Sequence, residues 1–233
     1  MIPVAPAYDR PVGESARYDL HADWYVEETS SWSTEPISPV PAPLDGMRVL
    51  ELACGYGRLA RRLARAGAHV TAVDLSSRLL EHAQWRERQE PLGIRYVLGD
   101  VTTTEWWDGA TFDGVVCEMA LMDIDDLDGA LATAAAVLEP GGWFAFAIVH
   151  PCHPGGSGTA SGMPSWPPDG GYAREGWWRN DGDVGIRSRV GATHRKLSTY
   201  LNAIVRAGFV LDEFNEPPFH VPLFLAARCH RRG

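Results

Sequence analysis

The chain has 233 residues, of which 45% are hydrophobic and 22% charged, a composition typical of a globular protein rather than a disordered one. Its formal net charge is −9, and its basic residues are scattered, so we expect neither nucleic acid nor an anionic membrane as a partner. Four separated cysteines, the absence of a signal-peptide pattern and the lack of an apolar run of roughly 20 residues predict a cytoplasmic protein without a metal site.

The first part of the chain differs from the rest. A short helix is predicted over residues 18–28, and four prolines within residues 30–43 indicate a linker. We therefore divide the chain into an N-terminal helical segment that acts as a lid, residues 1–45, and one domain, residues 46–233.

From residue 47 onward, apolar runs alternate with helical patterns, which predicts βαβ units in an α/β fold. The last two strands are joined by a Pro217-Pro218 turn and are expected to run antiparallel. The fold class that follows is a doubly wound, mostly parallel, seven-stranded sheet. The predicted strands are 47–53, 69–73, 94–98, 112–117, 143–149, 209–213 and 221–228, and the predicted helices are 58–66, 76–89, 127–138 and 194–207.

Residues 151–193 interrupt this alternation with a stretch rich in glycine, proline and tryptophan. A connection of this length is either functional or disordered. Its aromatic side chains allow two interpretations: a lid that closes over a bulky ligand, or a small satellite core under a long loop. Four of them are large enough for either: Trp166, Tyr172, Trp177 and Trp178.

Small or polar residues stand at the predicted carboxyl ends of the strands, where doubly wound sheets bind ligands. Gly55 and Gly57 let a ligand approach the backbone, and Asp74 can accept hydrogen bonds from both hydroxyls of a ribose. Two other interpretations stay open: a packing turn followed by a helix-capping aspartate, and dinucleotide binding through the Gly55-x-Gly57-x-x-Ala60 pattern.

Five blocks of sequence extend this pattern: VLELACGYGRLA (49–60), VTAVDLS (70–76), GDVT (99–102), FDGVVCEMALMDI (112–124) and LEPGGWFAFAIVHPC (138–152). In order and spacing they resemble the class I S-adenosylmethionine-dependent methyltransferases, in particular the small-molecule branch related to the quinone-biosynthesis methyltransferases. The resemblance implies a Rossmann-like fold and S-adenosylmethionine as cofactor. One departure is Ala53, where the family usually has glycine; because alanine is nearly as small, we expect little loss of cofactor binding.

The resemblance also implies roles along the cofactor. The glycine turn would pack on its methionine part, Asp74 would hold the ribose hydroxyls, and Leu75 and Asp100 would contact the adenine. Glu118, or its backbone carbonyl, would face the ammonium group. The full implied set is Tyr18, Tyr25, Glu51, Ala53, Cys54, Gly55, Gly57, Arg58, Asp74, Leu75, Asp100, Val101, Glu118 and Met119, with Tyr18, Tyr25 and Arg58 reaching the carboxylate.

Methyl transfer from a sulfonium is an in-line displacement that requires alignment and exclusion of water. A base is required only where the acceptor must lose a proton. His150, expected at the carboxyl end of strand 143–149 and facing the cleft, is the candidate; the alternative is that it only shapes the loop. Candidate substrate-binding residues are Met122, Asp123, His153, Trp166, Tyr172, Trp177 and Trp178.

The expected reaction is O-, N- or S-methylation of a bulky hydrophobic or aromatic small molecule, such as an intermediate of natural-product or antibiotic biosynthesis. The alternatives are N-methylation of a peptide N-terminus and a protein that binds S-adenosylmethionine without transferring its methyl group. We expect a monomer or a homodimer.

Overall fold

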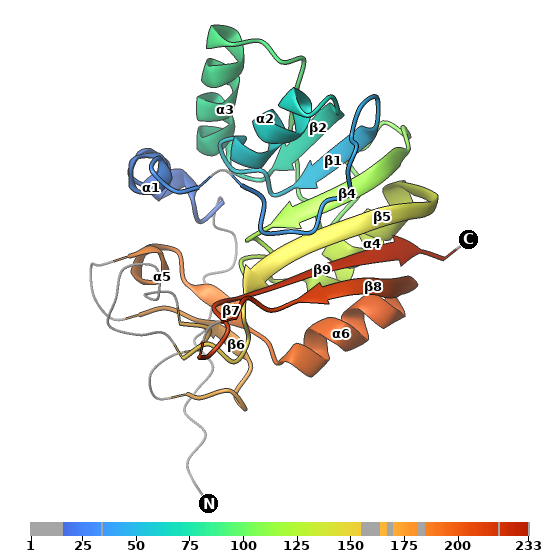
Figure 1. Cartoon of the computed structure of the whole chain (residues 1–233). Helices are drawn as coiled ribbons and strands as arrows, with labels where there is room; N and C mark the ends of the chain where they lie inside the picture. Colours follow the sequence, from blue (N-terminus) through green and yellow to red (C-terminus); the bar gives the residue numbers. More distant parts are fainter. Residues whose placement is uncertain are drawn as a thin grey trace, which may run out of the picture.

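A seven-stranded sheet in the order β3-β2-β1-β4-β5-β9-β8 forms the centre of the protein (Figure 1). The computed structural model describes residues 16–33, 35–154, 164–166, 170–180, 185–218 and 220–232. The strands are β1 (Arg48–Leu52), β2 (His69–Asp74), β3 (Arg95–Leu98), β4 (Phe112–Glu118), β5 (Leu138–Val149), β8 (Phe209–Asn215) and β9 (Phe224–Arg231).

The strand directions follow the prediction. Strands β1 to β5 run parallel to one another, whereas β9 runs antiparallel to both β5 and β8. All five parallel strands therefore end at the same edge of the sheet. The predicted doubly wound, mostly parallel α/β fold is confirmed.

Helices cover both faces of the sheet, so its strands are buried on two sides. Side chains of β1 alternate between two core clusters: Val49 packs with α2 (Arg58–Arg65), and Leu50 lies in the cluster that includes α4 (Leu127–Val137) and α6 (Leu197–Arg206). Figure 1 shows α2 on the opposite face of the sheet from α6. The remaining helices are η1 (Asp19–His21), α1 (Ala22–Thr29), α3 (Ser77–Gln89) and α5 (Ile186–Arg189).

Local sequence accounts for several element ends. Ser76 begins α3 as predicted, because its Oγ accepts a hydrogen bond from Leu79 N at 3.1 Å and so satisfies a free backbone donor of the first turn. Strand β5 begins earlier than predicted, at Leu138, which pairs with Phe112 before the register shifts. The pairing extends the strand through residues 139–142, which lie between the predicted helix 127–138 and the predicted strand 143–149.

The region around residues 176–194 differs from the prediction. Strand β6 (Gly176–Trp178) pairs antiparallel with β7 (Ala192–His194), and α6 begins at Leu197 rather than at His194. The His194 ring packs edge-on against Trp166 and Tyr172, and its Nε2 donates to Tyr172 O at 2.9 Å. These tertiary contacts hold His194 in the strand, where sequence periodicity alone predicts a helix.

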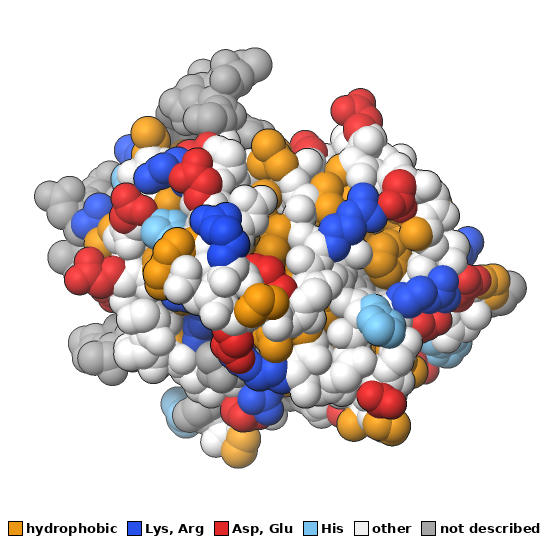
Figure 2. Space-filling model, turned by 90° about the horizontal axis from the view of Figure 1, so that it is seen from above, with side chains coloured by type: hydrophobic (Ala, Val, Ile, Leu, Met, Phe, Trp, Pro, Cys, Tyr) orange, Lys and Arg blue, Asp and Glu red, His pale blue; other side chains and the backbone are white. Residues whose placement is uncertain are grey.

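The surface carries charges of both signs side by side. Figure 2 shows acidic and basic side chains interspersed on the face seen from above, and ion pairs such as Arg78 with Glu81 on α3, 2.6 Å apart, are part of this pattern. Among the helices that the structure describes, none has the length and apolar character needed to cross a membrane.

Candidate cofactor and acceptor site

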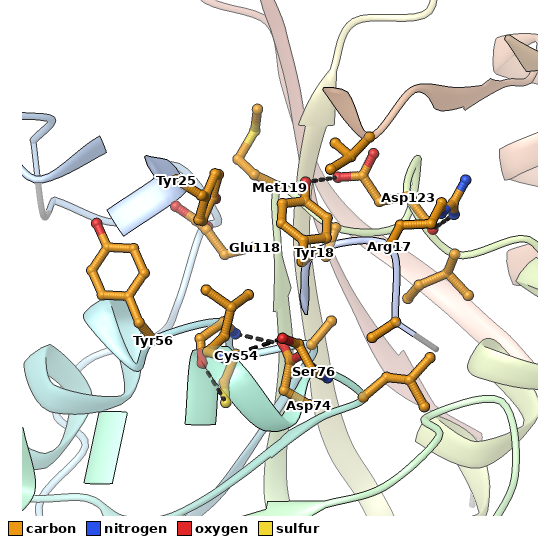
Figure 3. A pocket seen from close by; sticks show the side chains of 18 of the residues that line it. Arg17, Tyr18, Tyr25, Cys54, Tyr56, Asp74, Ser76, Glu118, Met119 and Asp123 are labelled. Carbon is orange, nitrogen blue, oxygen red and sulfur yellow. Dashed lines mark hydrogen bonds between the residues drawn. The ribbon is translucent and has the colours of Figure 1, made fainter. Parts of the chain in front are cut away.

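A cavity of about 1580 Å³ opens at the edge where the parallel strands end. Its lining includes residues of η1, α1 and the segment before β1, and residues around β6 and α5. Figure 3 shows Tyr18, Tyr25 and the strand-end residues of this cavity from close by. Of the residues predicted to bind the cofactor, these lie in its lining: Tyr18, Tyr25, Glu51, Ala53, Cys54, Gly55, Arg58, Asp74, Leu75, Asp100, Val101, Glu118 and Met119. Sequence blocks that are far apart thus meet around one space.

The two glycines of the turn after β1 have different tasks. Both have a positive φ, +56° at Gly55 and +80° at Gly57. A Cβ built on Gly55 would meet no described atom within 4 Å, so this glycine leaves the floor of the cavity open. A Cβ on Gly57 would lie 2.3 Å from the Tyr96 hydroxyl oxygen. Gly57 is outside the cavity lining formed by the described residues, and its missing Cβ leaves room for the Tyr96 side chain; its contact with the cofactor stays a prediction.

Ala53 is also in the left-handed region, with φ +54°. A Cβ in this conformation lies close to the following carbonyl and costs about 1–2 kcal/mol. The departure from glycine at this position therefore affects the backbone, beyond the small difference in side-chain size that the sequence comparison considered.

Asp74 is fixed at the end of β2 by the backbone of two turns (Figure 3). Its Oδ2 accepts from Gly55 N at 2.6 Å, and its Oδ1 accepts from Ser76 N at 2.8 Å. Burial raises the pKa of this carboxyl to about 6, although the two backbone donors act in the opposite direction. The carboxylate is therefore oriented and partly protonated near neutral pH before any ligand binds. Its contact with ribose hydroxyls stays a prediction.

Two further acids lie beside the turn. Glu51 is buried, and no described residue hydrogen-bonds its Oε2. Burial and the negative charge of Glu118 hold the pKa of Glu51 well above its usual range. The Glu118 carboxylate accepts from Ile37 N at 2.7 Å, from Ser38 N at 3.0 Å and from the Ser38 hydroxyl.

This arrangement changes the expected role of Glu118. Its side chain attaches the N-terminal segment to the end of β4, and its two oxygens already have partners. Of the two options implied by the family resemblance, the backbone carbonyl is the one whose acceptor is not engaged in these bonds, and its contact with the cofactor ammonium stays a prediction. Arg58 is engaged similarly: its Nη2 donates to the carbonyls of Trp32 and Ser33, both at 2.6 Å.

Asp123 connects three segments at the cavity wall (Figure 3). The Tyr18 hydroxyl donates to its Oδ2 at 3.0 Å, Arg187 Nη1 donates to its Oδ1 at 2.7 Å, and Arg17 donates to its backbone carbonyl. Burial, followed by the charge of Asp123, raises the pKa of Tyr18 well above its ordinary value. Tyr18 therefore keeps its proton and remains a donor. Tyr25 packs edge-on against Tyr18 with ring centroids 5.0 Å apart.

The ring of His150 does not point where the sequence predicted. It is buried at the end of β5, outside the cavity lining formed by the described residues. Its Nδ1 accepts from Cys152 N at 3.0 Å, so Nε2 carries the proton and lies 2.8 Å from Glu216 Oε1. The predicted orientation toward the cleft is wrong, because the turn after β5 directs the ring to its own loop and to Glu216. The geometry favours the alternative in which His150 shapes the loop.

The aromatic residues of the region 164–194 divide between the two interpretations. Trp177 lines the cavity, as does Asp123. Trp166 and Tyr172 pack against one another, with centroids 6.2 Å apart, and against His194. Trp178 is 2% exposed and donates from Nε1 to Ser165 O at 3.2 Å. For these last three aromatic residues the satellite core is the better description.

The other predicted substrate residues, Met122 and His153, are buried away from the cavity lining described here. Conversely, several lining residues had no sequence motif to single them out. They are Arg17, Ile37, Arg179, Arg189 and Phe224. Each reaches the cavity through long-range folding, and scattered arginines or single apolar residues carry no local pattern.

Residues 50–146 match a family described as a methyltransferase domain. The chain is 39% identical over 123 residues to a ubiquinone biosynthesis O-methyltransferase of Methylocella silvestris, which covers 47% of each chain. It is 35% identical over 154 residues to the enzyme of the same name from Xylella fastidiosa, which covers 60% of this chain and 62% of that one. The chain thus spans about half to three fifths of the length of these curated relatives.

A solved S-adenosylmethionine-dependent methyltransferase from Mesorhizobium loti is similar over most of its length. The TM-score is 0.64 at 26% identity, with 90% of this chain and 98% of that chain covered. Together with the strand order and the cavity at the carboxyl edge, these similarities relate the chain to the class I S-adenosylmethionine-dependent methyltransferases and, among them, to the quinone-biosynthesis enzymes.

Proposed function

We propose that the chain transfers a methyl group from S-adenosylmethionine to a bulky hydrophobic or aromatic small molecule, by O-, N- or S-methylation. The observation that carries this proposal is the continuity of one cavity. Its volume, about 1580 Å³, exceeds the roughly 300–1,000 Å³ of a typical small-ligand site, so that a cofactor and an acceptor both have room. The names of the curated relatives support a small-molecule acceptor.

The charges in the cavity suit a cationic donor at the strand ends. Asp74 and Glu118 lie beside the glycine turn, where their negative charge favours the sulfonium and ammonium groups, and a cation bound there would in turn favour the ionised form of Glu51. The cofactor supplies an electrophilic methyl group when bound. The glycine turn and Asp74 then hold its position relative to the rest of the cavity.

The acceptor would occupy the part lined by Trp177 and Phe224. Their rings exclude water and fix the orientation of a flat apolar molecule. Because His150 lies elsewhere, we propose that alignment, rather than a proton transfer to this histidine, accounts for most of the rate.

The direct test is binding followed by turnover. Calorimetry should show binding of S-adenosylhomocysteine, and incubation with S-adenosylmethionine should release S-adenosylhomocysteine when an aromatic alcohol, amine or thiol is added. Binding without turnover on any acceptor class would support the non-transferring alternative. Binding of NADH without affinity for S-adenosylmethionine would overturn the proposal in favour of a dehydrogenase.

His150→Ala tests the role of alignment. We expect the rate of methyl transfer to stay within a few-fold of the unsubstituted protein once both are saturated with cofactor. A loss of about 10²-fold or more with unchanged cofactor affinity would instead assign His150 as a general base. Glu216→Gln is the companion variant, since it removes the negative charge beside His150 but keeps the ring and an acceptor for its Nε2.

A further inference from the structure

Two arginines stand in the cavity wall opposite the acidic strand ends. Arg179 directly follows β6, and Arg189 is the last residue of α5. Figure 1 places α5 and β6 away from α2 and α3, so these arginines and the glycine turn approach the cavity from different sides. Within the described residues neither arginine forms an ion pair with a carboxylate.

Arg189 is held in place without having its charge neutralised. Its Cζ lies 4.1 Å from the centroid of the Trp24 ring, a cation–π contact that fixes the guanidinium. Its Nε is buried, with no hydrogen-bond partner in the described part of the chain. No hydrogen bond from the described residues therefore satisfies this nitrogen, and the guanidinium is positioned by the Trp24 ring.

Three acidic side chains that line the same cavity already have hydrogen-bond partners. Asp123 is paired with Arg187 and Tyr18, and Asp125 accepts from the Thr193 hydroxyl at 3.0 Å. Asp126 caps α4 by accepting from Gly129 N at 2.9 Å. These acids are therefore occupied, and they leave the charge of the two arginines available to a ligand.

His21 lies close enough to Arg179 and Arg189 for their charges to affect its pKa. Burial, and then the positive charges of Arg189 and Arg179, lower the pKa of this histidine below its ordinary value of 6.5. The ring is therefore neutral at physiological pH and adds no cation of its own. The positive potential at this wall comes from the guanidinium groups.

We propose that Arg179 and Arg189 form a subsite for a carboxylate group of the methyl acceptor. The planar fork of a guanidinium matches a carboxylate in two parallel hydrogen bonds. A singly charged group fits better than a dianion, because Asp123, Asp125 and Asp126 also line the cavity and would repel additional negative charge. This inference rests on the proposed function and narrows its acceptor to an aromatic or apolar acid.

The test uses matched acids and amides, which differ in charge but hardly in shape. The probes are benzoate with benzamide, 2-naphthoate with 2-naphthamide, and 2-anthroate with 2-anthramide, titrated by calorimetry into protein saturated with S-adenosylhomocysteine. We expect at least one acid to bind about tenfold more tightly than its amide, as a charge-assisted bidentate contact implies.

Arg179→Gln and Arg189→Gln should each weaken binding of that acid several-fold, and the double variant should bind the acid and amide equally. Affinity for S-adenosylhomocysteine should not change in any of them. Arg88→Gln is the matched control, because Arg88 is an exposed arginine in the last turn of α3.

Three results would overturn the subsite: binding of none of the acids, a preference for the acid that survives in the double variant, or a loss of S-adenosylhomocysteine affinity in the arginine variants. The last would show that the arginines hold the cofactor. If the unsubstituted protein failed to bind S-adenosylhomocysteine, the proposed function itself would be wrong, and the subsite with it.

Discussion

The two walls of the cavity are built in different ways. On the cofactor side, the ends of parallel strands and the backbone of a tight turn place the functional groups, and Asp74 is fixed by N–H donors of Gly55 and Ser76. On the side of β6 and α5, side chains such as Trp177 and Arg189 make the wall, and Arg189 is held there by its contact with Trp24, which is distant in sequence. A site made by backbone geometry is visible in local sequence, whereas one made by long-range side-chain packing is not.

The largest expected effect tests whether the two walls fold as one unit. Trp178→Ala removes a ring that is 2% exposed and should lower the free energy of unfolding by about 3–5 kcal/mol. Urea unfolding followed by circular dichroism measures this change. Trp85→Ala, at an exposed position of α3, should have an effect within about 0.5 kcal/mol. A main transition unchanged by Trp178→Ala would mean that the region around β6 unfolds independently.

Asp74→Ala tests the cofactor wall. Loss of hydrogen bonds from a ligand to a charged group should weaken S-adenosylhomocysteine binding by about 1.5–3 kcal/mol. Asp113→Ala is the control: Asp113 accepts from Arg48 N at 2.8 Å near the amino end of β4, away from the cavity, and its loss should leave the affinity unchanged. Equal affinities of the Asp74→Ala variant and the unsubstituted protein would remove the ribose contact from the proposal.

The raised pKa of Asp74 predicts a pH effect. With a pKa of about 6, the ionised fraction falls about fourfold between pH 7.5 and 5.5, and affinity for S-adenosylhomocysteine should fall with it. The folding stability of the ligand-free protein should change in the opposite direction, increasing as the pH falls. Because folding raises this pKa from 3.8, protonated Asp74 stabilises the fold, and that stability is lost as pH rises through about 6. Asp74→Asn should remove the contribution of Asp74 to both pH dependences. Calorimetry at pH 7.5 and 5.5 measures the affinity, and urea unfolding at the same two pH values measures the stability; an unchanged pH dependence in the variant would contradict the prediction.

The smallest expected effect concerns the strained alanine. Ala53→Gly relieves the positive φ, although glycine has more freedom to lose on folding, so the net gain should be at most about 1 kcal/mol. Ala60→Gly, inside α2, should instead cost about 1 kcal/mol. We expect the free energy of unfolding, measured with urea, to rise in Ala53→Gly and to fall in Ala60→Gly. A fall in both variants would show that the backbone of Ala53 is not strained.

The sequence was most informative where structure is local. Apolar runs located the strands, Ser76 marked the start of α3, and strand-end residues such as Asp74 and Glu118 came together at one cavity. Local pattern could not reveal that the Glu118 carboxylate binds backbone more than 80 positions away at Ile37.

Side-chain direction and competing tertiary contacts were beyond prediction. His150 occupies the expected position at the end of β5, but its ring contacts Glu216, which directly follows β8 and is 66 positions away in sequence. His194 has the spacing of a helical residue and is held in β7 by two aromatic rings. In both, contacts between segments distant in sequence decided the outcome.

The carboxylate of Asp123 couples two segments that a ligand would have to pass on entering the cavity. One oxygen is bonded to Tyr18, 105 positions earlier, and the other to Arg187, 64 positions later. Breaking either bond leaves a mostly buried charge half satisfied, which weakens the reason for the other to persist. The segment around Tyr18 and the helix α5 are therefore both held by the side chain of Asp123. A molecule that enters the cavity by displacing one of these two elements would also weaken the attachment of the other.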